Sequence, residues 1–260
     1  MKDIRKKLLI EENRQLSSRT WFLKLHGDLH SEIEKVESDN NSDRAGQFVN
    51  IEIPGKYLRR PISVNRIFTR QKELHLLYNI AGEGTKILSS LPIGTEVDVL
   101  IGLGNGFSIP QEITNPLLLG GGIGAAPLFQ FAYNLVENGK KPTVVLGYNS
   151  KDESWGMEQQ LREIGIATYV ATLDGSEGTK GFVTDVIAEK ALKYDYFYAC
   201  GPMPMLRALS ELPVEGELSL ECRMGCGFGA CVCCSIETVN GNKRICKEGP
   251  VFKKSELIWK

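Results

Sequence analysis

Four cysteines near the C-terminus constrain the fold of this chain more than any other feature. Cys226, Cys231 and Cys234 follow the spacing C-x4-C-x2-C, and a fourth thiol follows at Cys246. This is the thiolate spacing of plant-type [2Fe–2S] sites. The glycines between Cys226 and Cys231 can adopt positive φ and bring backbone amides close to sulfur. The segment is therefore predicted to hold a [2Fe–2S] cluster, a centre that moves electrons one at a time.

Zinc is the alternative metal for these thiols. Structural zinc sites usually pair two short Cys/His knuckles across a longer spacer. Only Cys231 with Cys234 fits such a knuckle, and no histidine follows His75. The remaining cysteines are interpreted as buried or cluster-adjacent thiols that ligate no metal: Cys200, Cys222 and Cys233. Cys222 and Cys233 lie close enough in sequence to stay open as alternative ligands of the cluster, in place of one of the four.

The composition is that of a globular protein. Of the 260 residues, 42% are hydrophobic and 24% charged, and 31 basic against 32 acidic residues leave a formal net charge of −1. Basic residues are scattered, which argues against nucleic acid as a partner. The start, 1–7, carries charges without a following apolar core, and no stretch has the length of a membrane span. An odd cysteine count without a signal peptide predicts a reducing, cytoplasmic location and no membrane association.

The first part of the chain, from residue 14 to about 110, is predicted to be all-β. Short β-branched, aromatic or apolar segments alternate with Gly, Pro, Asn and Asp clusters. The expected strands are Thr20–Leu25, Gln47–Ile53, Glu73–Asn79 and Glu96–Ile101. In the last of these, Val97, Val99 and Ile101 face one way. The pattern favours an antiparallel barrel, with the polar stretch Ser31–Arg44 as a solvated hairpin loop.

After Asn115 strands and helices alternate. The expected strands are Pro116–Leu119, Thr143–Leu146, Thr168–Ala171 and Tyr196–Ala199, and the expected helices are Leu128–Leu135 (closed by Gly139), Glu158–Ile164, Val183–Ala191 and Met205–Leu209. Such alternation predicts a parallel sheet wound in Rossmann style. The chain is thus expected to be a multidomain α+β protein: an antiparallel β-barrel over 1–112, a Rossmann-like α/β domain over 113–213 and a small cluster domain over 214–260.

Two turns in the α/β region are candidates for binding a nucleotide. Gly120–Gly124 lies between a strand and a helix, where free amides and the helix dipole favour a pyrophosphate, although glycine runs after strands are also common as tight turns. The second turn, Cys200-Gly201-Pro202-Met203, follows the last strand, at the edge where ligands of open sheets bind. Cys200 is a candidate neighbour of a nicotinamide, or a small buried thiol.

Two segments of the β region are candidates for a phosphate or flavin. Arg59-Arg60-Pro61-Ile62-Ser63 puts a guanidinium and a hydroxyl close together, and arginine pairs well with phosphate. Gly82–Lys86 is interpreted as a glycine turn with exposed amides. The alternative interpretation of each is an ordinary one, a surface arginine pair for the first and a loop for the second.

Taken in order, these motifs resemble the ferredoxin reductase-type flavoproteins and, among them, the electron transfer subunits of dihydroorotate dehydrogenase B. The resemblance spans nearly the whole chain, includes 103–107, and is most specific at Glu221–Cys231. It implies FAD held by Arg60, Pro61, Ile62, Ser63, Leu77, Tyr78, Asn79, Gly84 and Thr85. It implies NAD over Gly121, Gly122, Gly124, Cys200, Gly201, Pro202 and Met203. It also implies a [2Fe–2S] cluster on Cys226, Cys231, Cys234 and Cys246.

The resemblance further implies an FMN-containing catalytic subunit that oxidises dihydroorotate in pyrimidine synthesis, in a heterotetramer of two plus two. Electrons would pass from FMN through the cluster and FAD to NAD⁺, with the cofactors carrying the chemistry and no catalytic side chain required. Gly147-Tyr148-Asn149-Ser150 after the second strand offers no basic residue before Lys151, which favours NAD over NADP.

Two alternatives stay open: the small subunit of an NADPH-dependent ferredoxin reductase or sulfide dehydrogenase complex, in which one cluster ligand is an aspartate, and a zinc-stabilised interaction module.

Overall fold

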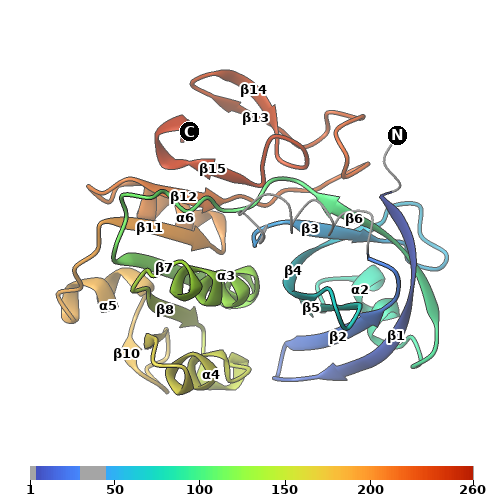
Figure 1. Ribbon diagram of the computed structural model, residues 1–260, viewed down its shortest axis with the longest axis horizontal. Coiled ribbons are helices and arrows are strands. Elements are labelled where there is room, and N and C mark those ends of the chain that lie inside the picture. The colour runs from blue at the N-terminus through green and yellow to red at the C-terminus, as the bar shows by residue number, and fades with distance from the viewer. Residues whose placement is uncertain (1–3, 30–44, 260) are drawn as a thin grey trace.

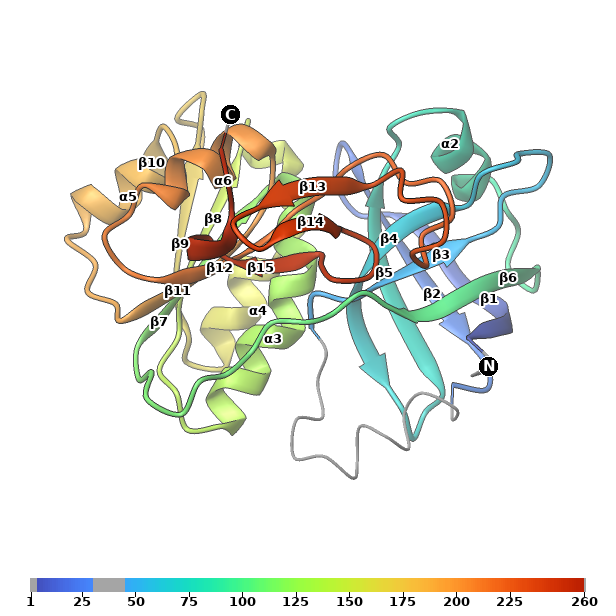
Figure 2. The same cartoon turned by 90° about the horizontal axis from the view of Figure 1, so that it is seen from above.

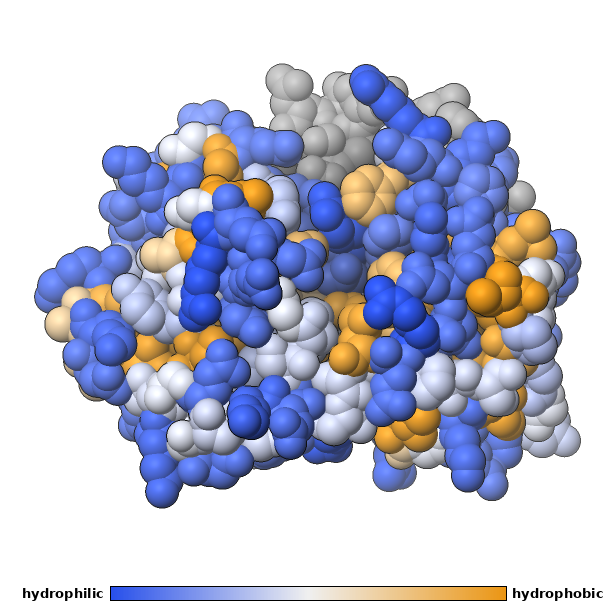
Figure 3. Space-filling model, turned by 90° about the horizontal axis from the view of Figure 1, so that it is seen from below, coloured by the Kyte–Doolittle hydropathy of each residue, from blue (hydrophilic) through white to orange (hydrophobic). Residues whose placement is uncertain are grey.

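The computed structural model describes residues 4–29 and 45–259, so the predicted hairpin loop at Ser31–Arg44 lies outside the described residues. A barrel and an α/β half lie side by side, and the C-terminal segment runs across the top of both (Figures 1 and 2). No helix in the described part of the chain is long and apolar enough to cross a membrane. The face away from the C-terminal segment is mostly hydrophilic, with a group of apolar residues where the halves meet (Figure 3).

The N-terminal half is a closed antiparallel barrel. Within residues 4–29 and 45–103 six strands close in the order β1-β2-β5-β4-β3-β6. Their bounds are β1 Arg5–Gln15, β2 Thr20–His26, β3 Phe48–Ile51, β4 Arg60–Phe68, β5 Glu73–Asn79 and β6 Glu96–Leu103. Alternate residues fill the interior, as in β6, where Val97, Val99 and Ile101 all lie in the barrel core. The predicted alternation in this strand is confirmed.

The barrel contains elements that the sequence pattern did not indicate. Strand β1 begins at Arg5, well before the predicted start of the β region. The predicted glycine turn at Gly82–Lys86 is wrong, because Glu83 begins the short helix α2, Glu83–Ser89. The hydroxyl of Thr85 accepts hydrogen bonds from the backbone N–H groups of Ala81 (2.9 Å) and Gly82 (3.3 Å), which satisfies donors at the start of this helix.

The second half is an open sheet with helices on both faces. Over residues 116–253 the strand order is β10-β9-β8-β7-β11-β12-β15. The strands are β7 Pro116–Gly121, β8 Thr143–Tyr148, β9 Ala167–Thr172, β10 Thr179–Lys180, β11 Tyr196–Cys200, β12 Gly216–Ser219 and β15 Val251–Lys253. The helices are η1 Gly122–Ala125, α3 Ala126–Glu137, η2 Lys151–Glu153, α4 Met157–Glu163, α5 Val183–Glu189 and α6 Met203–Ser210. All neighbours pair in parallel except β12 with β15.

Different helices pack against the two faces of the open sheet. On β11, Tyr198 packs with α3 and α4, whereas Phe197 packs with α5 and α6. Helix α3 ends where the sequence predicts, since Gly139 (φ 72°) donates to Val136 O and Lys140 donates to Leu135 O. The predicted Rossmann-like winding and the mixed α+β fold class are confirmed.

The C-terminal segment starts and returns on the open sheet. Strand β12 extends the open sheet in parallel, and β15 pairs with it in antiparallel fashion at the edge. Between them lies the hairpin of β13, Ser235–Thr238, and β14, Gly241–Arg244, and the short helix η3, Lys254–Glu256, follows β15. The strands β12 and β15 follow the predicted domain boundary at residue 213, yet they belong to the same sheet as the strands that precede it.

Side-chain hydrogen bonds fasten the linker after β6 to this segment. The side chain of Asn105 donates to Glu248 O (3.0 Å) and Val251 O (2.9 Å) and accepts from Val251 N (3.0 Å). The buried carboxylate of Glu217 on β12 accepts from Ser108 N at 2.8 Å and from its hydroxyl. The linker between the barrel and the open sheet is thus fixed by hydrogen bonds to residues of the C-terminal segment.

Burial raises the pKa of Glu217 above its ordinary value, although the hydrogen bonds from Ser108 oppose the shift. A raised pKa in the folded state means that its contribution to stability is complete below the unfolded pKa and declines as pH rises through the folded pKa. The difference in free energy of unfolding between wild type and Glu217→Gln should therefore fall as pH rises above the unfolded pKa of about 4.3, as measured in urea titrations. Glu215 is a nearby exposed residue, and Glu215→Gln should have the same free energy of unfolding as the wild type at each pH. A constant difference for Glu217→Gln would contradict the assignment.

Candidate functional site

The four predicted cluster thiols converge in two pairs. The backbone N–H groups of Ala230 and Cys231 donate to Cys226 Sγ at 3.2 and 3.4 Å, and Cys226 N donates to Cys231 Sγ at 3.4 Å. Cys246 N donates to Cys234 Sγ at 3.4 Å. Cys234 and Cys246 are buried, whereas Cys231 is exposed. We name residues 222–234 the thiol loop.

The pairing of the thiols can be compared with the donor set that the predicted cluster needs. Among the described residues, no group of three or more His, Cys, Asp or Glu side chains is placed around a single point. Two thiols per iron is the donor set of a [2Fe–2S] centre, and N–H···S hydrogen bonds are its usual support. The residues present therefore fit the predicted cluster.

The electrostatics of the two pairs differ. Burial opposes ionisation of Cys226, but the backbone N–H groups of Cys231, Phe228 and Ala230 outweigh it and lower the pKa of Cys226 to about 6. Burial, together with the neighbouring Cys234, raises the pKa of Cys246 to about 12. Because only thiolates bind iron, cluster assembly must displace the proton of Cys246.

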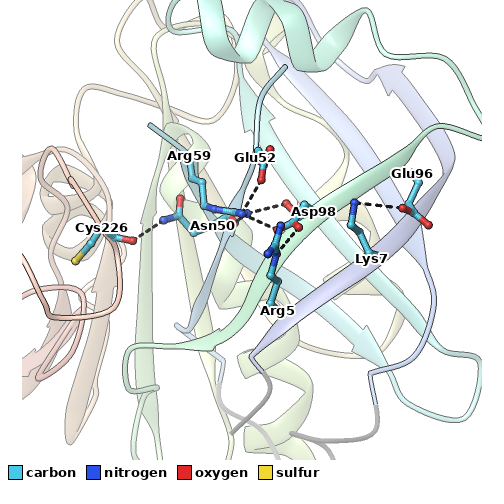
Figure 4. A network of polar contacts seen from close by, with 8 residues as sticks. All are labelled: Arg5, Lys7, Asn50, Glu52, Arg59, Glu96, Asp98 and Cys226. Atoms are coloured by element: carbon cyan, nitrogen blue, oxygen red, sulfur yellow. Dashed lines mark hydrogen bonds and ion pairs between the residues drawn. The ribbon is translucent and has the colours of Figure 1, made fainter. Parts of the chain in front are cut away.

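The thiol loop is held from both sides. On the C-terminal side, Arg244 Nη1 donates to Gly229 O (2.6 Å), and the same guanidinium pairs with Glu248. On the barrel side, Asn50 Nδ2 on β3 donates to Cys226 O (3.1 Å), the contact seen in Figure 4. Sequence reasoning missed Arg244 and Asn50, because no local pattern signals a contact between residues so distant along the chain.

The other cysteines have separate places. Cys222 Sγ and Cys233 Sγ both lie near the carbonyl oxygen of Arg223, at 3.4 and 4.0 Å. Burial raises the pKa of Cys222 to about 11. The thiol of Cys200 lies in the core between the open sheet and α3, and burial raises its pKa to about 12. The geometry thus favours the buried-thiol interpretation of Cys200.

The two predicted nucleotide turns pack directly against each other. A side chain on Gly124 would place its Cβ 2.6 Å from Cys200 O and from Gly201 Cα, and one on Gly121 would place it 2.9 Å from Pro202 Cδ. Gly122 differs, since its φ is +53° and the space beside it is open. The glycines therefore serve first to let the turns meet at the carboxyl edge of the sheet, beside the start of α3, where a pyrophosphate is expected.

The predicted flavin residues lie on adjacent barrel elements: β4, β5 and α2. The Arg60 guanidinium occupies the space beside Gly84, where an added Cβ would lie 2.3 Å from Arg60 Nε. Ile62 and Tyr78 point into the barrel core, and Tyr78 Oη donates to Asn13 Oδ1 (2.9 Å). Contacts from these two residues to a cofactor outside the barrel must therefore come from the backbone.

The remaining flavin residues face away from the core. Pro61 is exposed, Ser63 is half-buried, and the side chain of Asn79 accepts a hydrogen bond from the Thr20 hydroxyl (3.1 Å). Leu77 alternates with Tyr78 along β5 and lies outside the barrel core cluster. The outer face of β4 and β5, the Arg60 guanidinium and the start of α2 form a set of donors and apolar surfaces that fits an FAD.

Two family models match the chain in the segments that the geometry singles out. Residues 221–258 match the iron–sulfur cluster binding domain of dihydroorotate dehydrogenase B. Residues 118–211 match an oxidoreductase NAD-binding domain. Barrel, open sheet and thiol loop together define a ferredoxin reductase-like protein with a C-terminal iron–sulfur segment.

Curated relatives narrow this class further. The chain is 41% identical to the dihydroorotate dehydrogenase B (NAD(+)) electron transfer subunit of a Geobacillus species, over 96% of this chain and 97% of that one. It is 42% identical to the subunit of the same name from Fusobacterium nucleatum, over 95% and 96%. The chain belongs to the family of dihydroorotate dehydrogenase B electron transfer subunits, which confirms the predicted resemblance.

Among solved structures, one of an NADH-dependent reduced ferredoxin-NADP oxidoreductase, described for flavin-based electron bifurcation, superposes with a TM-score of 0.84. It is 30% identical and covers 97% of this chain and 90% of that chain.

Replacing one thiol of the buried pair tests the ligand set. Cys246→Ser should remove iron, sulfide and the visible cluster absorbance while FAD stays bound, because serine is a poor thiolate substitute and the barrel is untouched. Iron, sulfide and flavin analysis of anaerobically purified protein measures this. Cys222→Ser and Cys233→Ser serve as controls that should retain the cluster. A full cluster in Cys246→Ser would instead identify Cys222 or Cys233 as the ligand.

Closing the gap between the two turns tests the nucleotide site. Gly124→Ala should raise the KM for NADH at least about tenfold, equivalent to about 1.4 kcal/mol, because its Cβ must displace the Cys200–Gly201 backbone. Gly165→Ala, which has φ +84° and open space around it, is the matched control. It should cost about 1 kcal/mol of stability and leave the KM unchanged. If Gly124→Ala and Gly165→Ala have the same KM for NADH, the nucleotide does not bind at the two turns.

Proposed function

We propose that this chain carries electrons between the dihydroorotate-oxidising FMN of a partner subunit and NAD⁺. Its relatives are named electron transfer subunits of dihydroorotate dehydrogenase B (NAD(+)). The observation that carries the proposal is the joining, in one chain, of a one-electron thiolate site with a ferredoxin reductase-like barrel and nucleotide sheet. A flavin accepts two electrons or one, so it converts between an iron–sulfur cluster and a nicotinamide. The protein's own part is to bind, orient and shield these groups.

We assign each group to a separate set of described residues. The outer face of β4 and β5 with α2 would hold FAD, and the meeting turns at Gly121–Gly124 and Cys200–Met203 would hold NAD. The two thiol pairs would hold the cluster. In functional terms 1–112 is the flavin unit, 113–213 the nucleotide unit and 214–260 the cluster unit, with β12 and β15 shared between the last two.

The thiol loop also supports a subunit interface. Phe228 is 48% exposed and Val232 60% exposed, and both belong to the thiol loop that carries the exposed Cys231. An apolar surface beside a one-electron centre suits a partner that must exchange electrons with it. We infer that the partner is an FMN-containing catalytic subunit, in a complex of two plus two in the cytoplasm.

A negative charge near the nucleotide site supports NAD rather than NADP. Glu153 Oε2 accepts from Asn149 N (3.3 Å) and Asn149 Nδ2 (3.0 Å), directly after the carboxyl end of β8. A carboxylate at this position would repel a 2′-phosphate. Arg19 of the barrel pairs with the same carboxylate at 3.2 Å, which fixes the orientation of the carboxylate and offsets part of its charge.

A second candidate is the small subunit of an NADPH-dependent ferredoxin reductase or sulfide dehydrogenase complex. The favouring observation is the superposition on the bifurcating oxidoreductase at 30% identity. The four cysteines here argue against it, since that group is expected to use one aspartate.

Co-purification with the FMN subunit tests the proposal. The complex should reduce NAD⁺ with dihydroorotate, and the isolated chain should lack this activity yet oxidise NADH with an artificial acceptor, because only FAD and the cluster remain. NADPH should serve poorly in both. Co-purification instead with a larger flavoprotein carrying further clusters, together with NADPH dependence, would favour the second candidate. A colourless, iron-free protein that contains zinc would contradict both candidates and favour the zinc-stabilised interaction module.

A further inference from the structure

Asn50 lies between the flavin strand and the thiol loop. Its backbone is on β3, where its cross-strand partner is Pro61, one of the residues expected to hold FAD. Its side chain points out of the barrel, because the neighbouring Val49 and Ile51 fill the interior. There Nδ2 donates to the carbonyl oxygen of Cys226, the first of the cluster thiols along the chain (Figure 4).

The contact is closely packed as well as polar. Asn50 is only 1% exposed. Gly227, next to Cys226, has a φ of +78°, and an added Cβ there would lie 2.4 Å from Asn50 Nδ2. The loop approaches β3 this closely only because the residue is glycine.

Charged groups hold the backbone of Asn50 in turn. Arg59 Nη1 lies 3.4 Å from Asn50 O and donates to Asp98 O at 3.0 Å. Arg59 Nη2 pairs with Asp98 Oδ1 at 2.6 Å, and Arg5 pairs with the same carboxylate, which is 5% exposed (Figure 4). A buried carboxylate shared by two guanidinium groups fixes the strand positions that face the loop.

One polar atom of Asn50 is left over. Its Oδ1 is buried and accepts no hydrogen bond from the described residues. An orphaned buried acceptor is uncommon. It is therefore open to a donor outside the protein, such as a cofactor N–H or O–H group or an ordered water.

We propose that Asn50 is a positioning residue for electron transfer: it sets the distance and orientation of the Cys226 side of the cluster relative to the flavin strand. The inference rests on the proposed function. Each transfer moves one electron between cluster and flavin, so that one centre is oxidised as the other is reduced, and no bond forms or breaks. Asn50 is itself neither oxidised nor reduced; it acts through its hydrogen bond to the Cys226 backbone.

The test compares Asn50→Ala with Asn65→Ala in the full chain loaded with FAD and iron. Asn65 is a matched control, because its buried Nδ2 also donates to a backbone carbonyl, that of Ala126 on α3 (2.8 Å), away from the thiol loop. Rapid mixing with NADH under anaerobic conditions, followed by flavin absorbance and freeze-quench EPR, separates flavin reduction from cluster reduction.

In Asn50→Ala, flavin reduction should stay within about twofold of wild type, and electron passage to the cluster should slow at least about tenfold. Its cluster should also show altered EPR g-values and a shifted reduction potential, which a general loss of stability does not produce. Asn65→Ala should lose a comparable free energy of unfolding. Its cluster should keep the wild-type EPR g-values and the wild-type reduction potential. Asn50→Ser, which retains a shorter donor, should lie between.

Wild-type EPR, potential and transfer rate in Asn50→Ala would overturn the inference. If Asn50→Ala does not fold, Asn50→Ser decides the matter by the same readouts, with wild-type values again contradicting the proposal. None of these readouts requires the partner or dihydroorotate. A failure of the proposed function would show as a wild-type chain without iron and flavin, or without activity beside the FMN subunit.

Discussion

Backbone pairing of β12 with β15 is the constraint on which the rest of the structure depends. The chain leaves the open sheet after β12, forms the thiol loop and the β13–β14 hairpin, and returns to the same edge at β15. Both ends of this excursion are pinned to the sheet, and the thiol loop between them extends over the barrel (Figure 2). Cys234, Cys246 and Phe252 then share one apolar cluster with Phe48 of the barrel and Leu218 of the sheet.

This packing explains how one chain can serve two kinds of electron chemistry. The proposed site of the nicotinamide is the carboxyl edge of the parallel sheet, that of the flavin is the outer face of the barrel, and that of the cluster is the set of thiols with backbone amide donors. The Asn105 and Glu217 hydrogen bonds set the linker between the first two, and Asn50 sets the third against the barrel. Position is the protein's main contribution, and the bound groups supply the reactivity.

Much of this could be predicted from local sequence. The alternation in β6, the stop at Gly139 and the cysteine spacing are all encoded by residues close along the chain. The charge-rich β1 was not predicted, because only Leu8 and Ile10 of its residues are fully buried. The start of α2 was obscured by Gly84, which is small because the Arg60 guanidinium needs its space.

Contacts distant in sequence account for the rest. Strands as short as β12 and β15, with four and three residues, carry too little periodicity to be recognised alone. The Asn50–Cys226 hydrogen bond joins residues 176 positions apart. No local propensity reports such a contact, so the placement of the thiol loop over the barrel had to come from the folded chain.

An anaerobic reductive titration of the isolated chain tests most directly whether a two-electron and a one-electron centre share this fold. The structure predicts uptake of about three electrons per chain, two that bleach the flavin and one that produces a single EPR signal of a reduced [2Fe–2S] cluster. Uptake of two electrons with no EPR signal, in protein whose four thiols are intact, would contradict it.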